Sequence, residues 1–275
     1  MLSIEEGGTM QAMTTQHRAD VAVIGGSGFY SFFSADARTV SLETPYGPTS
    51  GDITIGDVNG RSVAFLPRHG ARHEYSPHTL PYRANMWALR MLGVQRVFAP
   101  CAVGSLVPEY GPGTVVIPDQ LVDRTSGRNQ TYFEEGGVHV EFADPYCHEL
   151  RGAALQDGVV DGGTMVVVEG PRFSTRAESQ WFARQGWTLV NMTGHPEAVL
   201  ARELELCYTP IALVTDLDAG IEAGQGVRAV DVFAEFQKNI EPLKALVRAA
   251  IDAALMGPCE SCRVHEGIDL PIELP

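Results

Sequence analysis

Two acidic residues, Asp216 and Asp218, are the side chains whose type and spacing point most directly to chemistry. They follow the apolar run Ile211–Val214, and carboxylates at alternate positions of a strand end can project to the same side. Such a pair could bind a metal ion, cap a helix or contact a heterocyclic base. A buried carboxylate with a raised pKa can also act as a general acid, which contributes roughly 10²–10⁴ in rate. No histidine or third acid is adjacent, so the metal alternative has no support in this stretch.

The basic turn Pro67–Gly70 is a second candidate, and it follows the predicted strand Arg61–Leu66. The planar guanidinium of Arg68 matches an oxyanion such as phosphate, and His69 adds a further donor. The alternative is a surface turn with solvated charges. We favour anion binding because charged residues stand where neutral turn residues would serve equally well.

Small residues follow two other predicted strands. Gly25–Gly28 follows the strand Asp20–Ile24 and could cradle a phosphate on backbone N–H groups. It lacks the third glycine of a dinucleotide-binding motif, so a tight turn is an equal alternative. Residues 101–105 follow the strand Arg96–Pro100 and could either approach an anion or simply pack. Phe173, at a further strand end, could stack on a base or pack.

The stretch Leu189–Gly220 must position the acidic pair, Asp216 and Asp218. It reads as an apolar strand, a polar turn at 191–194, a helix over Glu197–Leu206 that ends before Pro210, a second strand, and an acidic turn at 215–218. This order predicts a βαβ unit. Ligands bind outside the carboxyl ends of strands in open α/β sheets, so both polar turns are expected to face one pocket.

The rest of the chain also alternates strands with helices, which predicts a single α/β domain with a central mixed, largely parallel twisted sheet flanked by helices. Residues 124–145 are rich in Gly, Asn, Asp and Glu and are expected to form a long loop. We expect residues 1–18 to be disordered, 19–256 to form the domain and 257–275 to be an irregular tail. The remaining predicted strands are Val40–Glu43, Asp52–Val58, Gly113–Ile117 and Gly163–Val168, and the remaining helices are Tyr82–Leu92, Tyr146–Gln156, Thr175–Gln185 and Val230–Leu255.

Composition excludes several classes of protein. With 275 residues, 44% hydrophobic residues and a net charge of −14, the chain is typical of a globular protein and a poor candidate for binding nucleic acid. No run reaches the ~18 apolar residues that a membrane span needs, and no signal peptide is evident, so we expect a cytoplasmic protein. Five cysteines do not suggest a disulfide framework. Cys259 and Cys262, near His265, form a C-x-x-C pair, but a structural zinc site needs four ligands, so we predict no metal.

Eight segments, taken together and in order, resemble the trimeric purine nucleoside phosphorylase family, and within it the 5′-methylthioadenosine phosphorylase branch. They are VIGGSGFY, TPYGPTS, FLPRHG, PYRANMWAL, VGSLVPEYGPGTVVIPDQLVDRT, VEGPRFSTRAE, NMTGHPE and VTDLDAG. The resemblance runs from about Val21 to Leu255. It implies reversible phosphorolysis, in which phosphate attacks C1′ of the ribose and the purine leaves. It also implies no cofactor, phosphate as a co-substrate, and a homotrimer or a homohexamer built as a dimer of trimers.

The resemblance assigns roles to individual residues. Asp216 holds the proton for N7 of the leaving base, His69 shares the catalytic role, and Asp218 contacts the 6-amino group. The matching phosphate-binding positions are Ser27, Arg68, His69, Cys101, Ala102 and Thr193, with Cys101 standing where the branch more often has Thr. The matching nucleoside-binding positions are Phe173, Met192, Asp216, Asp218, Val230, Phe233, Ala234 and His139, the last of which reaches in from a neighbouring subunit.

The base specificity depends on a few positions. Ser174 stands where 6-oxopurine branches have Glu, and a carboxylate at Asp216 or Asp218 would face a 6-oxo group lone pair to lone pair, so we favour 6-aminopurines. The pairs Gly194-His195 and Ala219-Gly220 depart from the branch, which keeps a 6-oxopurine nucleoside phosphorylase acting on inosine, guanosine or methylthioinosine as the alternative. His195 could line the pocket or stabilise the turn.

Two further classes of function are alternatives to phosphorolysis. A dinucleotide-dependent oxidoreductase would use Gly25–Gly28, but the missing third glycine argues against it. A nucleoside-binding protein without activity would not need Arg68, His69 and Asp216 together.

Overall fold

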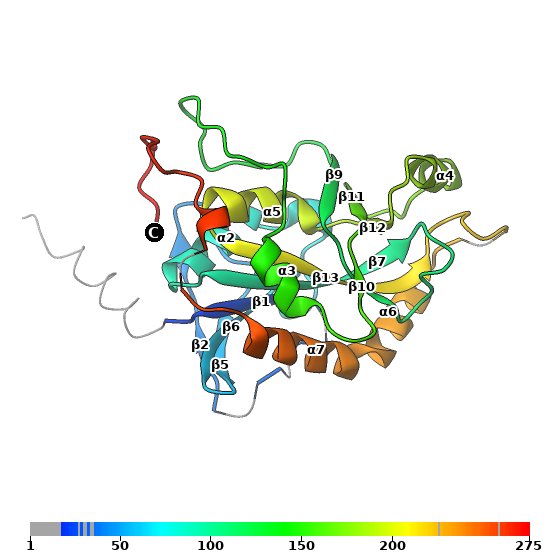
Figure 1. Ribbon diagram of the computed structural model, residues 1–275, viewed down its shortest axis with the longest axis horizontal. Coiled ribbons are helices and arrows are strands. Elements are labelled where there is room, and N and C mark those ends of the chain that lie inside the picture. The colour runs from blue at the N-terminus through cyan, green and yellow to red at the C-terminus, as the bar shows by residue number, and fades with distance from the viewer. Residues whose placement is uncertain (1–17, 27, 30–31, 34–35, 225, 258) are drawn as a thin grey trace, which may run out of the picture.

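The computed structural model describes residues 18–275 except 27, 30–31, 34–35, 225 and 258 (Figure 1). The predicted disordered segment 1–18, apart from Arg18, and the predicted phosphate ligand Ser27 therefore lie outside the described residues. The strands are β1 (Val21–Gly25), β2 (Arg38–Val40), β3 (Glu43–Thr44), β4 (Gly47–Pro48), β5 (Ile53–Val58), β6 (Arg61–Pro67), β7 (Arg96–Ser105), β8 (Val115–Ile117), β9 (Gln120–Arg124), β10 (Val160–Asp161), β11 (Thr164–Val168), β12 (Leu189–Asn191) and β13 (Cys207–Leu217). The helices are α2 (Tyr82–Met91), α3 (His148–Ala154), α4 (Arg176–Arg184), α5 (Gly194–Glu203), α6 (Ala229–Lys238) and α7 (Ile240–Ala253), with 3-10 turns η1 (Pro77–Thr79) and η2 (Glu260–Cys262).

A central mixed sheet runs in the order β10-β8-β13-β7-β1-β6-β5-β2. Its middle strands β13, β7, β1 and β6 are parallel, and they are buried on both faces, as near-continuous apolar runs predict. In β1 the alternation is visible: Ala22 and Ile24 join the apolar cluster that contains α2 and α5, whereas Val21 and Val23 join the cluster with α3, α6 and α7. The helices thus cover both faces of the sheet (Figure 1), which confirms the predicted fold class.

A branch of the sheet opens beside β7. Strand β1 pairs with the first part of β7, at Arg96–Phe98, and β12 pairs with its last part, at Gly104 and Ser105. Because β13 occupies the other edge of β7 along its whole length, β1 and β12 share one edge and leave a gap between them. Behind β12 the branch continues through β11 to β9.

The predicted βαβ unit is wrong in its topology. Strand β12 runs antiparallel to β7, whereas β13 runs parallel to it, so the two strands joined by α5 are not parallel partners. The helix ends at Glu203, before a turn in which Glu205 has a φ of 54°, and Pro210 lies inside β13 opposite Ala99. The hydrophobic pattern predicted each element but not its direction, which depends on pairing with distant strands.

Two other boundaries differ from the prediction. Residues 101–105 are not a loop but the second half of β7, which continues because β13 pairs with it throughout. The predicted helix Val230–Leu255 is two helices, α6 and α7, that meet at Asn239, where φ is −102° and ψ is 7°.

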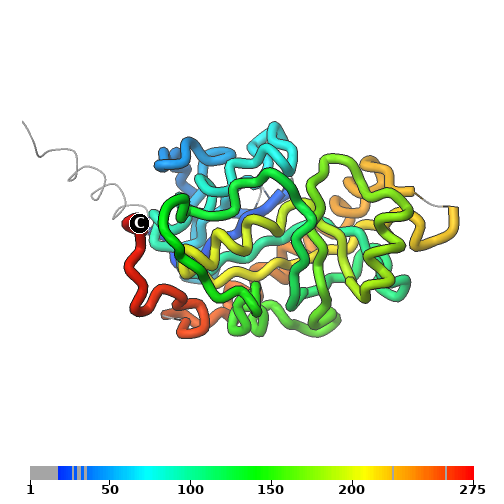
Figure 2. The backbone as a smooth tube through the Cα atoms, turned by 90° about the horizontal axis from the view of Figure 1, so that it is seen from above, coloured from blue at the N-terminus to red at the C-terminus, as the bar shows by residue number. Residues whose placement is uncertain are grey.

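Among the described residues of the C-terminal segment 257–275, the only regular secondary structure is η2. This segment lies at the end of the molecule opposite α4, as the red trace shows in both views (Figures 1 and 2). In the described part of the chain, no helix combines the length and apolar character that crossing a bilayer would require.

Candidate active site

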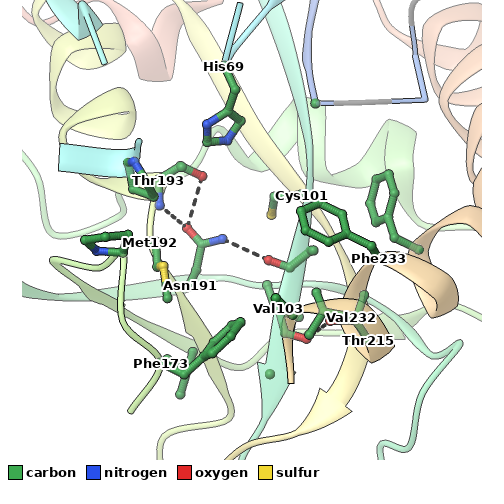
Figure 3. A pocket seen from close by; sticks show the side chains of 18 of the residues that line it. His69, Cys101, Val103, Phe173, Asn191, Met192, Thr193, Thr215, Val232 and Phe233 are labelled. Carbon is green, nitrogen blue, oxygen red and sulfur yellow. Dashed lines mark hydrogen bonds between the residues drawn. The ribbon is translucent and has the colours of Figure 1, made fainter. Parts of the chain in front are cut away.

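A cavity of about 370 Å³ opens at the gap beside β7 (Figure 3). Both predicted polar turns, 191–194 after β12 and 215–218 at the end of β13, contribute to it, which confirms that they face one pocket. The cavity is lined by Gly26, Arg68, His69, His73, Tyr75, Ser76, Pro77, Pro100, Cys101, Ala102, Val103, Gly104, Pro171, Phe173, Ser174, Val190, Asn191, Met192, Thr193, Thr215, Asp216, Asp218, Ala229, Val232, Phe233 and Phe236.

The open edge of β7 offers backbone groups to the cavity. Its carbonyl oxygens are bound by side chains in place of a neighbouring strand: Arg68 Nη1 donates to Pro100 O at 3.0 Å, and Asn191 Nδ2 donates to Ala102 O at 3.2 Å. In an extended strand the N–H and C=O of one residue point to the same edge. The Ala102 N–H therefore points toward the cavity as a donor for an anion.

Arg68 is buried and already holds a carboxylate. Its Nε and Nη2 donate to the two carboxylate oxygens of Glu197 at 2.6 and 3.1 Å, and Tyr208 OH donates to the same carboxylate at 2.8 Å. The bonds to Glu197 and Pro100 use three of the five guanidinium N–H groups and leave two for a ligand. Glu197 fixes the guanidinium plane, a function that the sequence pattern did not reveal.

His69 is held as a neutral imidazole. Burial lowers its pKa to about 4, and the nearby positive charge of Arg68 adds to the effect. Its Nδ1 lies 2.9 Å from Tyr75 O, so the neutral ring donates there and leaves Nε2 with a lone pair. The ring of His73, another cavity residue, stacks on it at 4.4 Å. Near neutral pH His69 is thus an acceptor, and it becomes a second donor only when a bound anion raises its pKa.

The turn after β12 is shaped by the side chain of Asn191. Its Oδ1 accepts hydrogen bonds from Thr193 N at 2.8 Å and Gly194 N at 2.7 Å, while Nδ2 reaches across to Ala102 (Figure 3). Thr193 is thereby fixed at the same end of the cavity as His69, with the Met192 side chain at the wall. Asn191 was not among the predicted site residues, although it begins the conspicuous NMTG turn.

The long loop supplies a buried arginine that holds this turn in place. Arg128 Nη1 donates to Met192 O at 3.0 Å, Nη2 donates to Glu169 O at 2.7 Å, and its Nε pairs with the Glu169 carboxylate at 3.2 Å. Arg128 also lies over the Tyr82 ring at 5.4 Å. The loop was predicted, but no local pattern marks Arg128 among its other polar residues.

Two carboxylates lie at the end of β13, where the cavity meets the sheet. Burial raises the pKa of Asp216 to about 6, and the neighbouring charge of Asp218 adds to the rise, although a hydrogen bond from Thr215 at 2.9 Å opposes it. Asp218 is also buried and accepts a hydrogen bond at 2.6 Å from Ser179, which lies on α4. A Cβ at Gly104 would lie 3.2 Å from Asp216 Oδ1, so glycine there allows the close approach.

The other walls are apolar. The Phe173 ring points into the cavity from the loop before α4, and Ser174 beside it has a buried hydroxyl without a hydrogen-bond partner among the described residues (Figure 3). Opposite β7, α6 presents Ala229, Val232, Phe233 and Phe236 at helical spacing.

Some predicted site residues lie elsewhere. Val230 is 60% exposed, and neither it nor Ala234 lines the cavity, because the helical period turns Val232 inward instead. His139 is exposed and does not line the cavity formed by the described residues of this chain. His195 is buried outside the cavity lining, with Nε2 lying 2.7 Å from Gln130 Oε1, which favours the structural alternative.

The remaining predicted residues come together in one cavity. They are Arg68, His69, Cys101, Ala102, Phe173, Met192, Thr193, Asp216, Asp218 and Phe233. Residues that the sequence analysis missed are Asn191, Val232 and His73 in the cavity, and Glu197, Ser179 and Arg128 behind it.

Sequence relatives share nearly the whole chain. It is 70% identical over 257 residues to the S-methyl-5′-thioadenosine phosphorylase of Mycolicibacterium smegmatis, covering 93% of this chain and 99% of that protein. It is 52% identical over 281 residues to the purine nucleoside phosphorylase of Streptomyces coelicolor, covering 96% of this chain and 100% of that protein. These matches confirm the resemblance.

Solved structures agree with this fold. A methylthioadenosine phosphorylase from an antarctic soil metagenomic library superimposes with a TM-score of 0.80 at 42% identity, covering 86% of each chain. The Schistosoma mansoni methylthioadenosine phosphorylase in complex with adenine superimposes with a TM-score of 0.79 at 33% identity, covering 86% of this chain and 91% of that one. The family model described as Phosphorylase superfamily matches residues 20–253. The chain is therefore a member of the phosphorylase superfamily.

Proposed function

We propose that this protein cleaves 5′-methylthioadenosine with phosphate to adenine and 5-methylthioribose 1-phosphate. One observation carries the proposal: the same cavity is lined by the anion donors around Arg68 and by Asp216, an acid whose pKa is raised. The relatives named as methylthioadenosine phosphorylases favour this substrate over the alternative.

The reaction needs a general acid that protonates the leaving purine. A phosphate oxygen forms a bond to C1′, the bond from C1′ to N9 breaks, and its electron pair moves into the purine. Protonation of N7 by Asp216 neutralises the leaving base, and the carboxylate left behind is restored by a proton from solvent. With a pKa of about 6, this carboxyl keeps a usable protonated fraction near neutral pH. These steps use inorganic phosphate as co-substrate and involve no cofactor.

Phosphate would bind at the opposite end of the cavity. The donors available there are the two remaining N–H groups of Arg68, the Ala102 N–H and the Thr193 hydroxyl. His69 Nε2 can accept a hydrogen bond from a protonated phosphate oxygen. Burial raises the pKa of Cys101 to about 12, so its thiol stays neutral and adds no repulsion. Ser27, which lies outside the described residues, stays a predicted phosphate ligand.

The base would lie between Phe173 and the two carboxylates. Because Ser179 donates to Asp218 Oδ2, the carboxylate is oriented, and its other oxygen can accept from a 6-amino group. The unpartnered hydroxyl of Ser174 is a further polar contact for the purine. Met192 would pack against the ribose.

The 5′ substituent would meet the apolar face of α6. Val232 and Phe233 suit a methylthio group better than a hydroxyl, which would lose its hydrogen bonds there. Phe233 and Val230 are exposed, as expected where a neighbouring subunit completes the site with His139. We propose a homotrimer, or a homohexamer formed as a dimer of trimers, in the cytoplasm, where the small-molecule substrates occur.

A 6-oxopurine nucleoside phosphorylase remains the second candidate. The relative from Streptomyces coelicolor is named only as a purine nucleoside phosphorylase, so membership alone does not fix the base. Ser179 orients Asp218 so that a carboxylate oxygen would face a 6-oxo group lone pair to lone pair, which disfavours this candidate.

The proposal is tested by purine release from 5′-methylthioadenosine, adenosine and inosine, each with and without phosphate. Phosphate-dependent release of adenine, fastest from methylthioadenosine, is expected. Faster release of hypoxanthine from inosine would support the second candidate, and release that does not require phosphate would refute phosphorolysis.

A further inference from the structure

Four cysteines from three distant segments meet at the far end of the sheet from the cavity. Their sulfur atoms, in Cys147, Cys207, Cys259 and Cys262, all lie within 4.8 Å of one another, and all four side chains are buried. Cys147 is the N-cap residue of α3, Cys207 begins β13, Cys259 precedes η2, and Cys262 is the last residue of η2. Figure 1 shows the red C-terminal segment beside α3. From this geometry we propose that the four cysteines bind one structural zinc ion.

The distances fit a tetrahedral thiolate site. Zinc binds cysteine sulfur at about 2.3 Å, so the edges of an S₄ tetrahedron measure about 3.8 Å. The sulfurs of Cys147 and Cys259 are 3.8 Å apart. The remaining sulfurs need move by no more than about 1 Å, since none of the separations exceeds 4.8 Å. The spacing of Cys259 and Cys262, the second of which ends the 3-10 turn that follows the first, is also typical of a zinc knuckle.

Hydrogen bonds around the sulfurs suit thiolates. The Leu150 N–H, in the first turn of α3, points at Cys147 Sγ at 3.5 Å. Ser261 Oγ lies 3.2 Å from Cys259 Sγ and can donate to it. Such outer contacts orient metal ligands in known sites.

Two buried arginines can balance the charge. A zinc ion with four thiolates carries a net charge of −2, because each thiol releases its proton to solvent on binding. Arg96 donates to Gly257 O at 2.9 Å, and Arg202 donates to Ser261 O at 2.8 Å, so both guanidinium groups border the cysteine-bearing segment. Among the described residues neither forms an ion pair with a carboxylate.

The position indicates a structural role. Cys207 and Asp216 lie near opposite ends of β13, about 30 Å apart along the strand. The ion would join the C-terminal segment to α3 and to the first residue of β13, and would not reach the substrates. No metal is predicted from the sequence because only one C-x-x-C pair is visible along the chain, whereas folding brings Cys147 and Cys207 to it.

The test is the metal content of the whole protein, purified without chelators and measured by inductively coupled plasma mass spectrometry. We expect about one zinc ion per chain in the wild type and at least a fivefold loss in Cys262→Ser. The matched control is Cys101→Ser, which changes the fifth cysteine, outside the cluster, and is expected to keep its zinc.

A second measurement needs only the wild type, in case the variant does not fold. Alkylation under denaturing, non-reducing conditions should label all five cysteines and release about one zinc ion per chain. Cobalt added to metal-free protein should give the absorption of a tetrahedral tetrathiolate complex, and zinc should raise the melting temperature. Disulfide-linked cysteines, or five free thiols in a protein without zinc, would overturn the proposal.

Discussion

Replacing Asp216 by Asn tests whether this carboxyl is the acid that protonates the leaving base. Burial beside Asp218 raises the pKa of Asp216 from 3.8 to about 6. At pH 7 the protonated fraction therefore rises from roughly 0.06% to roughly 9%, an increase of about 150-fold. If that form is the active one, kcat/KM for methylthioadenosine should fall as pH rises above about 6, approaching tenfold per pH unit.

The assay is adenine release at limiting methylthioadenosine and saturating phosphate between pH 5 and 9. Asp216→Asn should lower kcat/KM by roughly 10²–10³ at pH 6 and should also remove the alkaline decline. Phosphate and His69 titrate too, but both are unchanged in the variant, so any decline that they cause will persist. A variant whose kcat/KM lies within threefold of the wild-type value, or whose pH profile is the same as that of wild type, would refute the assignment.

Three further outcomes follow from the same geometry. Because folding raises the pKa of Asp216, ionisation of its carboxyl destabilises the folded protein above pH 6 but not below pH 3.8. In urea denaturation, Asp216→Asn should therefore have a higher free energy of unfolding than wild type at pH 8, by at most about 3 kcal/mol, and no gain at pH 3.5. Gly104→Ala should lower kcat/KM at least tenfold, since its Cβ would press on Asp216 Oδ1, whereas Gly111→Ala, with open space around it, should match wild type in the same assay. Ser179→Ala removes the hydrogen bond that orients Asp218 and should raise KM for methylthioadenosine about tenfold; an unchanged ratio of methylthioadenosine to inosine turnover would contradict this role.

The amino-acid sequence determined the kinds of element and the chemistry at their ends. Apolar runs and helical periods predicted the central strands and α2, because each pattern is local and reflects which face a segment buries. The same holds for the site: Arg68, His69 and Asp216 were predicted from residue types at strand ends, and all three line one cavity.

Pairing and direction were decided by the tertiary structure. The pattern around α5 is the same whether β12 runs parallel or antiparallel to β7, and only contacts with β11 and β7 fix the direction. That direction matters for function, because the gap between β1 and β12 exposes the β7 backbone to the cavity. Likewise, nothing local distinguishes Arg128 in the long loop from its polar neighbours.

The burial of a side chain and its contacts with residues far away in sequence are properties that no local pattern contains. The raised pKa of Asp216 depends on segments that enclose it from elsewhere in the chain, and the orientation of Asp218 depends on Ser179, 39 residues away in sequence. Cys147 and Cys259 are 112 residues apart in sequence, yet their sulfurs lie 3.8 Å apart. The sequence thus specified which groups are present, whereas long-range packing decided their neighbours, their solvent exposure and hence their chemistry.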